Sequence, residues 1–221
     1  MTTTRPKAHP LDLFGQAPPS VRAHLRLRWW TCPFPRIGGA VPREGRVLEV
    51  GCGHGLASLW LALESPRRSV VGIDTDGDKI AAAQAAAARA RRLGASVEFR
   101  QTSLGALPRG PWDAVVVIDV LYLLDRAAQR PFVEHCAAAL GDGGALVVKE
   151  VAMQPRWKYG LAVVQEIVSV RLARITEGAG ISFVPPAMLA GWMGAAGLDV
   201  AESAIHRGYL HPHHLVVGHR R

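Results

Sequence analysis

The stretch from Arg46 to Gly55, RVLEVGCGHG, combines an acid with closely spaced glycines. The acid is Glu49, and the glycines are Gly51, Gly53 and Gly55. Glycine adopts positive φ readily and lets a ligand approach backbone N–H groups where a Cβ would collide. A helix that begins near Leu56 would direct its unpaired N–H groups and its positive dipole end at the same point. The stretch is therefore suited to hold a ligand against the backbone of a tight turn.

A second carboxylate, Asp74, stands at the end of the apolar run SVVGI, within VVGIDTDGDKI. Nucleotide-binding folds place an acid at the end of the second strand, about 20 residues after the glycine turn. A carboxylate there can accept hydrogen bonds from both ribose hydroxyls at once. The alternative is a cap for the following helix, but Asp76 is better placed for that role. Asp74 is therefore predicted to bind a ribose.

The hydrophobic pattern of the sequence predicts the strands and helices that position these residues. Val47, Leu48 and Val50 form a short apolar run of the kind found in strands buried on both faces. LASLWLAL then repeats apolar residues at helical spacing, and an alanine-rich helix is expected over 77–93. Further strands are predicted from Val97, Trp112, Ala145 and Leu198, with a last one in HPHHLVVGHR. Alternating strands and helices predict an α/β nucleotide-binding domain.

These motifs resemble those of the class I S-adenosylmethionine (SAM)-dependent methyltransferases. E-x-G-x-G-x-G after Val47 and Leu48 is similar to the first motif of that family, and VVGIDTDGDKI is similar to the second. A dinucleotide fingerprint would need glycine at position 56, where this chain has Leu56, so a dehydrogenase is disfavoured. The resemblance covers residues 46–219. It implies a Rossmann-like α/β fold with a seven-stranded, mostly parallel sheet, helices on both faces and an antiparallel last strand.

The resemblance also implies a site for SAM. The glycine turn would lie under the methionine part, Glu49 would support the amino end through the turn, and the backbone of 118–119 would lie nearby. Ser103 stands where family members commonly have an acid that bonds the adenine; a hydroxyl can accept that bond without charge. The expected cofactor residues are Glu49, Gly51, Cys52, Gly53, Gly55, Asp74, Thr75, Ser103, Leu104, Ile118 and Asp119.

Residues for chemistry on the acceptor are fewer. Tyr122 falls where many family members have a histidine facing the substrate, and His211 belongs to a C-terminal histidine cluster that could supply a base near neutral pH. Tyr122 and His211 are therefore the candidate catalytic residues. The alternatives are that Tyr122 only packs, that Asp119 caps a helical turn, and that the histidines are alternate residues of a strand.

The acceptor itself is expected to meet aromatic walls. Trp29 and Trp30 adjoin Arg28, which could hold a carboxylate, and Trp157 and Tyr159 open a later insertion. The predicted substrate-binding residues are Arg28, Trp29, Trp30, Tyr122, Trp157 and Tyr159. The alternative is that the tryptophans fasten these two segments to the core.

Proline and polar residues over 1–17 predict a disordered tail. Residues 18–45 are expected to form an N-terminal helical substrate cap, and 46–221 the methyltransferase domain. That domain would carry a helical insertion at about 154–183, a lid or the interface of a homodimer.

Composition narrows the function further. The 221 residues carry a formal charge of +8, but the arginines are scattered, so nucleic acid is not an expected partner. Three cysteines without metal-ligand spacing indicate a reduced, cytoplasmic compartment and no metal site, and no apolar run reaches the length of a membrane span. The sequence thus predicts a SAM-dependent enzyme that methylates an oxygen or nitrogen of a small molecule. The alternatives are an RNA or protein methyltransferase and a non-catalytic partner protein with this fold.

Overall fold

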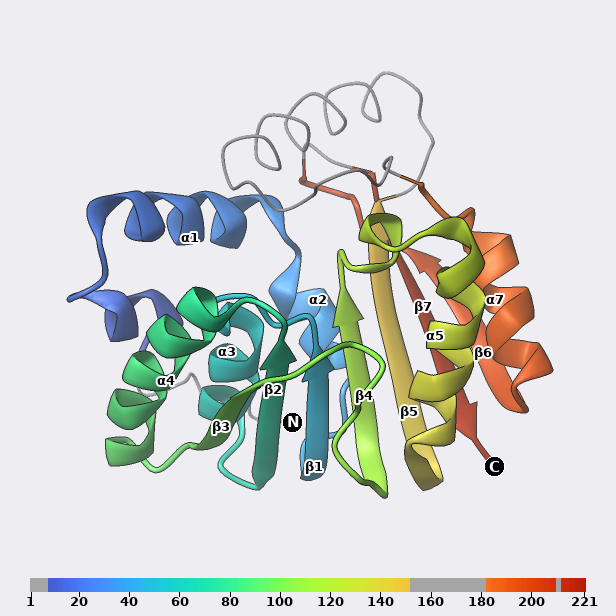
Figure 1. Ribbon diagram of the computed structural model, residues 1–221, viewed down its shortest axis with the longest axis horizontal. Coiled ribbons are helices and arrows are strands. Elements are labelled where there is room, and N and C mark those ends of the chain that lie inside the picture. Colours follow the sequence, from blue (N-terminus) through green and yellow to red (C-terminus); the bar gives the residue numbers. More distant parts are fainter. Residues whose placement is uncertain (1–7, 152–181, 210–211) are drawn as a thin grey trace.

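A computed structural model of the chain describes residues 8–151, 182–209 and 212–221. Seven strands form one sheet in the order β3-β2-β1-β4-β5-β7-β6 (Figure 1). The strands are β1 (Gly45–Val50), β2 (Arg68–Asp74), β3 (Ser96–Gln101), β4 (Trp112–Ile118), β5 (Leu140–Val151), β6 (Leu198–Ala204) and β7 (His213–Arg220). The pairs formed among β1 to β5 are parallel, whereas β7 runs antiparallel to both β5 and β6. The predicted sheet, with its antiparallel last strand, is confirmed.

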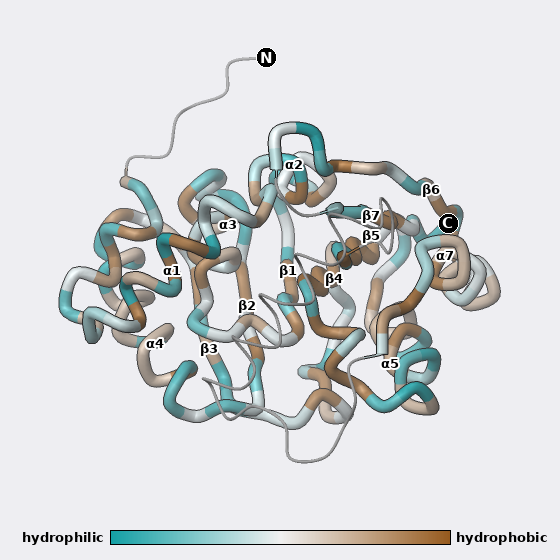
Figure 2. The backbone as a smooth tube through the Cα atoms, turned by 90° about the horizontal axis from the view of Figure 1, so that it is seen from above, coloured by the Kyte–Doolittle hydropathy of each residue, from teal (hydrophilic) through white to brown (hydrophobic). Residues whose placement is uncertain are grey.

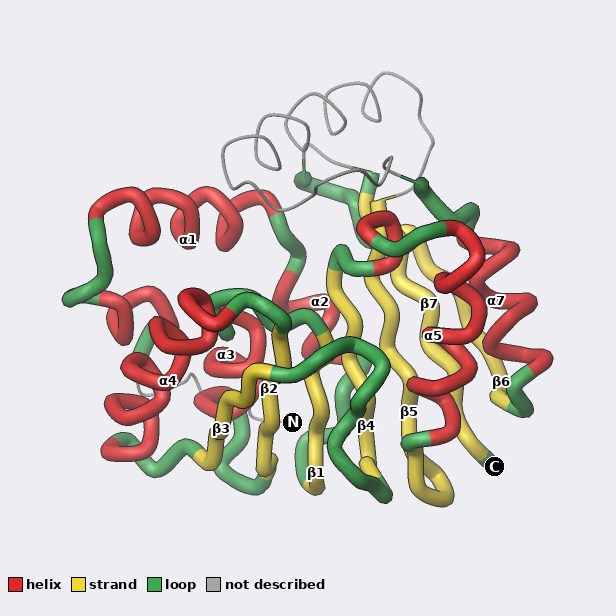
Figure 3. Tube along the Cα trace, in the orientation of Figure 1, coloured by secondary structure: helices red, strands yellow, loops and turns green. Residues whose placement is uncertain are grey.

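Helices cover both faces of the sheet, as the view from above in Figure 2 shows, and Figure 3 distinguishes helices from strands by colour. The helices α2 (Phe34–Gly39), α3 (Leu56–Glu64) and α4 (Gly77–Arg92) lie on one face, and α5 (Arg126–Ala138) and α7 (Pro186–Ala195) lie on the other. Successive strand residues point to opposite faces of the sheet. Val47 packs with the helices of the first face and Leu48 with those of the second, and neither is exposed. The alternation follows from the two-residue period of a strand and explains the continuous apolar runs.

Local signals in the sequence account for the α4 boundaries. The Asp76 carboxylate accepts hydrogen bonds from the backbone N–H groups of Asp78 and Lys79, each at 3.1 Å, and so caps the first turn. Arg91 and Arg92 lie in the last turn, where the helix dipole favours positive charge. Since Asp76 takes the capping role, Asp74 is left for another one.

The expectation of disorder over 1–17 is wrong for its second half. Residues Pro10–Phe14 form a 3-10 helix, η1, beside α3 and α4, and Leu13 and Phe14 are buried in the core. Arg89 of α4 donates to the carbonyl of Leu13 at 2.7 Å and fastens η1 further. Two adjacent apolar side chains outweigh the proline-rich composition, because their burial compensates for the entropy lost on ordering. Residues 1–7 lie outside the described part of the chain.

The segment expected at 18–45 contains two helices, α1 (Pro19–Thr31) and α2, and its last residue, Gly45, already belongs to β1. Phe34 and Ile37 of α2 belong to the same core as the sheet, so this part of the segment is built into the domain. Almost all of the insertion expected at 154–183 lies outside the described residues, and Trp157 and Tyr159 lie there too. Among the described helices, none has the length and apolar character needed to cross a membrane.

Candidate functional site

The glycine turn lies between β1 and α3, at the carboxyl edge of the sheet. Gly51, Gly53 and Gly55 have φ values of 75°, 54° and 77°, a region that side chains with a Cβ rarely adopt. A Cβ at Gly51 would collide with Val120, and one at Gly55 would collide with Phe99. A Cβ at Gly53 would have no atom within 4 Å, so the backbone faces open space there. Gly51 and Gly55 thus permit packing, and Gly53 leaves the turn accessible to a ligand.

Asp74 ends β2 next to this turn. Its Oδ2 accepts from the N–H of Gly53 at 2.7 Å, and its Oδ1 accepts from the N–H of Asp76 at 3.0 Å. These two bonds fix the half-buried carboxylate and leave each oxygen a further lone pair. A SAM ribose fits this arrangement, because its two hydroxyls need two acceptors held side by side at an open turn.

Glu49 supports the turn from within the sheet. It is buried in β1 and accepts a hydrogen bond from the hydroxyl of Ser58, in the first turn of α3. Burial raises the pKa of Glu49 to about 7 even though the bond to Ser58 lowers it. Sequence reasoning missed Ser58, although a polar residue in the apolar run LASLWLAL was a signal. The contact of Glu49 with the amino end of SAM stays a prediction.

Asp119 follows β4 and is the one residue other than glycine with positive φ, 58°, among the described residues. Its Oδ1 accepts from Lys149 Nζ at 2.5 Å, and its Oδ2 accepts from Arg28 Nη2 at 3.1 Å. Burial alone would raise the pKa of Asp119, but the charges of Lys149 and Arg28 outweigh it and lower the pKa to about 2. The carboxylate therefore serves ion pairs with distant elements and does not cap a local turn.

The loop after Asp119 is held by Glu150, near the carboxyl end of β5. Its Oε1 accepts from the N–H groups of Val120 and Leu121, at 3.1 and 2.9 Å. Burial, assisted by the negative charge of Asp119, raises the pKa of Glu150 to about 8. Tyr122 lies in the adjacent 3-10 helix η2 (Leu121–Leu123), only 3% exposed and 5.2 Å from the Phe183 ring centroid. This burial favours a packing role; catalysis by Tyr122 stays a prediction.

Helix α1 crosses the carboxyl edge near the glycine turn (Figure 1). The rings of His24 and His54 have centroids 5.7 Å apart, and Arg28, one turn further along α1, reaches Asp119. Burial, together with the neighbouring His24 and Lys79, lowers the pKa of His54 to about 4. His54 is therefore neutral near pH 7, and α1 is fastened to the site through Arg28.

The two tryptophans of α1 have different surroundings. Trp29 stacks on Phe34 with ring centroids 5.3 Å apart and meets the edge of Trp60 at 6.3 Å. Trp30 is 81% exposed. The contacts of Trp29 indicate that it fastens α1 to the core and do not favour contact with the acceptor. No described contact of Trp30 favours either role.

The remaining predicted residues lie around the same edge. Ser103 is exposed in the loop after β3, with Leu104 half-buried beside it. The carbonyl of Thr75 accepts from Gln101 at 3.1 Å, and Cys52 and Ile118 are buried next to the turn. His211, like Trp157 and Tyr159, lies outside the described residues. The structure therefore brings together the glycine turn, Asp74, Asp119 and Arg28.

Comparison with known proteins agrees with this geometry. A family model described as "Methyltransferase domain" matches residues 48–146. A release factor glutamine methyltransferase of Koribacter versatilis is 36% identical over 122 residues, which are 51% of this chain and 42% of that protein. The chain thus spans less than half the length of that relative.

Two further comparisons cover more of the chain. A ubiquinone biosynthesis O-methyltransferase of Pseudomonas putida is 30% identical over 181 residues, covering 80% of this chain and 72% of that protein. The magnesium protoporphyrin IX methyltransferase of Synechocystis, solved with bound SAH, shares the fold with a TM-score of 0.63 and 19% identity, over 96% of this chain and 86% of that one. With the glycine turn and Asp74 in their expected places, the chain belongs to the class I SAM-dependent methyltransferases.

Proposed function

We propose that this protein transfers the methyl group of SAM to an oxygen or nitrogen of a small molecule. The observation that carries the proposal is the position of α1 over the carboxyl edge. Arg28 joins this helix to Asp119, and His24 faces His54 of the glycine turn. A helix fastened there limits the space in front of the methyl group, which suits a small acceptor better than a macromolecule.

The protein's part in such a reaction is alignment and exclusion of water. Asp74 would hold the ribose hydroxyls, and the glycine turn with Glu49 behind it would receive the methionine part. SAM supplies a methyl group on a sulfonium, which an acceptor displaces in line. Holding two reactants in that geometry lowers the barrier by several kcal/mol. A base is needed only for an acceptor that is protonated at working pH, and Tyr122 and His211 remain the candidates.

The acceptor side is proposed to involve the residues expected from the sequence. The Arg28 side chain is 35% exposed while it bonds Asp119, and it is proposed to approach an anionic group of the acceptor. Trp30, exposed one residue beyond Trp29, is the accessible aromatic residue of α1. Trp157 and Tyr159 are also proposed to bind the acceptor.

We further propose that the protein forms a homodimer through residues 154–183. Its proposed location is the cytoplasm.

The names of the relatives favour an oxygen acceptor, since the Pseudomonas relative is an O-methyltransferase. The Koribacter relative supports a second candidate, methylation of a protein. A sequence similar to N-P-P-Y after the fourth strand would favour that function, but this chain has Ile118-Asp119-Val120-Leu121. Asp119 is also committed to Lys149 and Arg28. Small-molecule transfer therefore ranks first.

Incubation with methyl-labelled SAM and an extract of the host tests this ranking. After ultrafiltration and chromatographic removal of unreacted SAM, label is expected in a small molecule of the filtrate, with little in the retained protein and RNA. Asp74→Ala should strongly reduce the transfer at low SAM concentration, because the cofactor loses its ribose anchor. Asp76→Ala, which removes the cap of α4 and an ion pair with Lys79, is the matched control and should keep the transfer. Label found mainly in retained protein would overturn the proposal in favour of the second candidate.

A further inference from the structure

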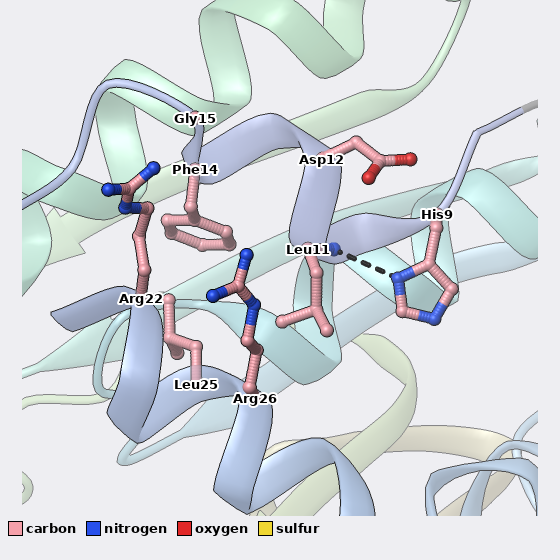
Figure 4. A pocket seen from close by; sticks show the side chains of 8 residues that line it. All are labelled: His9, Leu11, Asp12, Phe14, Gly15, Arg22, Leu25 and Arg26. Carbon is pink, nitrogen blue, oxygen red and sulfur yellow. Dashed lines mark hydrogen bonds between the residues drawn. The ribbon is translucent and has the colours of Figure 1, made fainter. Parts of the chain in front are cut away.

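A cavity of about 350 Å³ lies between η1 and α1, apart from the site described above (Figure 4). Three of its lining residues are apolar, and Phe14 and Leu25 among them are each 2% exposed. The polar part of the lining consists of His9, Asp12, Arg22 and Arg26. A volume of this size admits a small organic molecule. The cavity thus combines an apolar floor with charged walls.

The two arginines of this cavity are not paired with an acid in the part of the chain that the structure describes. Arg22 and Arg26 lie one turn apart on α1 and extend toward η1, on either side of the Phe14 ring in Figure 4. Within residues 8–151, 182–209 and 212–221, neither of them forms an ion pair. The Asp12 carboxylate, the one acid of the lining, points away from both guanidinium groups. The cavity therefore carries an excess of positive charge.

One donor of Arg22 is also left unsatisfied. Its Nε is buried and has no hydrogen-bond partner among the described residues. A buried donor without an acceptor is unfavourable, and most such groups in native proteins are paired. A planar anion beside Arg22 would supply the missing acceptor, and the fork of a guanidinium matches the two oxygens of a carboxylate.

The cavity lies on the opposite side of α1 from His24 and Arg28. At 3.6 residues per turn, Arg22 and Arg26 lie about 160° around α1 from His24 and Arg28. The latter pair faces His54 and Asp119, so α1 separates the cavity from the methyl-transfer site. A ligand in the cavity would therefore lie across α1 from His54 and Asp119.

We propose that this cavity is a second binding site, which takes a small carboxylate with an apolar body. The carboxylate would lie between Arg22 and Arg26 and accept from the buried Nε of Arg22, and the apolar body would rest on Leu11, Phe14 and Leu25.

Equilibrium dialysis of the full chain with labelled benzoate tests the proposal. Benzoate is expected to bind at least about tenfold more tightly than benzamide, which has the same shape without the charge. It should also bind more tightly than inorganic phosphate, which has no apolar body. Equal binding of benzoate and benzamide would overturn the proposal without any variant, and phosphate binding as tight as benzoate would overturn the assignment of an apolar body.

Variants locate the site. Arg22→Gln and Arg26→Gln should each weaken benzoate binding about tenfold. Arg92→Gln, at the exposed end of α4, is the matched control and should change nothing. SAM affinity and melting temperature, measured on the same samples, establish that each variant is folded. Unchanged benzoate affinity in both Arg22→Gln and Arg26→Gln would place the ligand elsewhere and refute the inference.

Discussion

Arg28 donates to Oδ2 of Asp119 at 3.1 Å, across 91 positions of sequence. The same carboxylate accepts from Lys149 Nζ through its other oxygen. Lys149 is buried, whereas the Arg28 side chain is 35% exposed. One carboxylate therefore joins a buried cation of β5 to the helix that crosses the cofactor edge, and its two ion pairs should differ in strength.

Asp119→Asn should destabilise the protein by about 3–5 kcal/mol, because it leaves the buried charge of Lys149 without a counter-charge. Asparagine tolerates the positive φ of this position, so the substitution tests the charge and not the backbone. Arg28→Gln should cost about 1 kcal/mol, since its pair is partly exposed and Lys149 keeps its partner. Urea unfolding measures both. Equal losses in the two variants would show that the strengths were ranked wrongly.

Asp74→Ala should weaken SAM binding by about 1.5–3 kcal/mol, because two ribose hydroxyls lose their acceptor. Asp76→Ala should leave SAM affinity unchanged and lower the stability by about 1 kcal/mol, the usual effect of losing a helix cap. Isothermal titration and thermal unfolding separate the two effects. If Asp74→Ala bound SAM as tightly as the unchanged protein, the ribose assignment would fail.

The raised pKa of Glu49 predicts a pH effect on stability. An acid with a pKa of about 7 when folded, against 4.5 ordinarily, retains its proton longer in the folded state. Its contribution is fully present below the unfolded pKa and is lost as pH rises through about 7. The glutamine of Glu49→Gln cannot ionise. The stability of this variant should therefore fall less than that of the unchanged protein between about pH 5 and pH 7.

Melting temperatures over this pH range measure the effect of Glu49→Gln. Glu44→Gln, in which an exposed acid is changed, is the matched control and should keep the full decline. Glu150, whose pKa is raised to about 8, should maintain the remaining slope in both variants. An unchanged slope in Glu49→Gln would mean that Glu49 ionises normally in the folded protein.

Trp29 and Trp30 should respond differently to truncation. Trp29→Ala removes contacts with Phe34 and Trp60 and should cost about 3 kcal/mol, at the low end for tryptophan because the residue is partly exposed. Trp30→Ala removes an exposed side chain and should alter stability by less than about 0.5 kcal/mol. Urea unfolding checks both values. Methyl transfer per folded molecule then shows whether either residue contacts the acceptor; a stable Trp29→Ala variant with lost transfer would favour the acceptor wall.

The local parts of the site were predictable from the sequence alone. The turn from β1 to α3 needs positive φ at Gly51, Gly53 and Gly55, and glycine is the residue that adopts it without strain. The place of Asp74 at the end of β2 was predictable too, because the apolar run before it and the capping residue Asp76 lie within a few positions of it. Interactions over a few residues depend on backbone geometry, which spacing reveals.

The partners of the charged and polar side chains were decided only by the tertiary structure. Asp119 was expected to present its backbone to SAM or to cap a turn, but its side chain pairs with Arg28 and Lys149. Glu150 bonds the N–H groups of Val120 and Leu121 because β5 lies beside β4. Leu13 and Phe14 are ordered because α3 and α4 offer them a surface. In each case the fold brings together residues that are far apart along the chain. The spacing of residues in the sequence does not reveal such contacts.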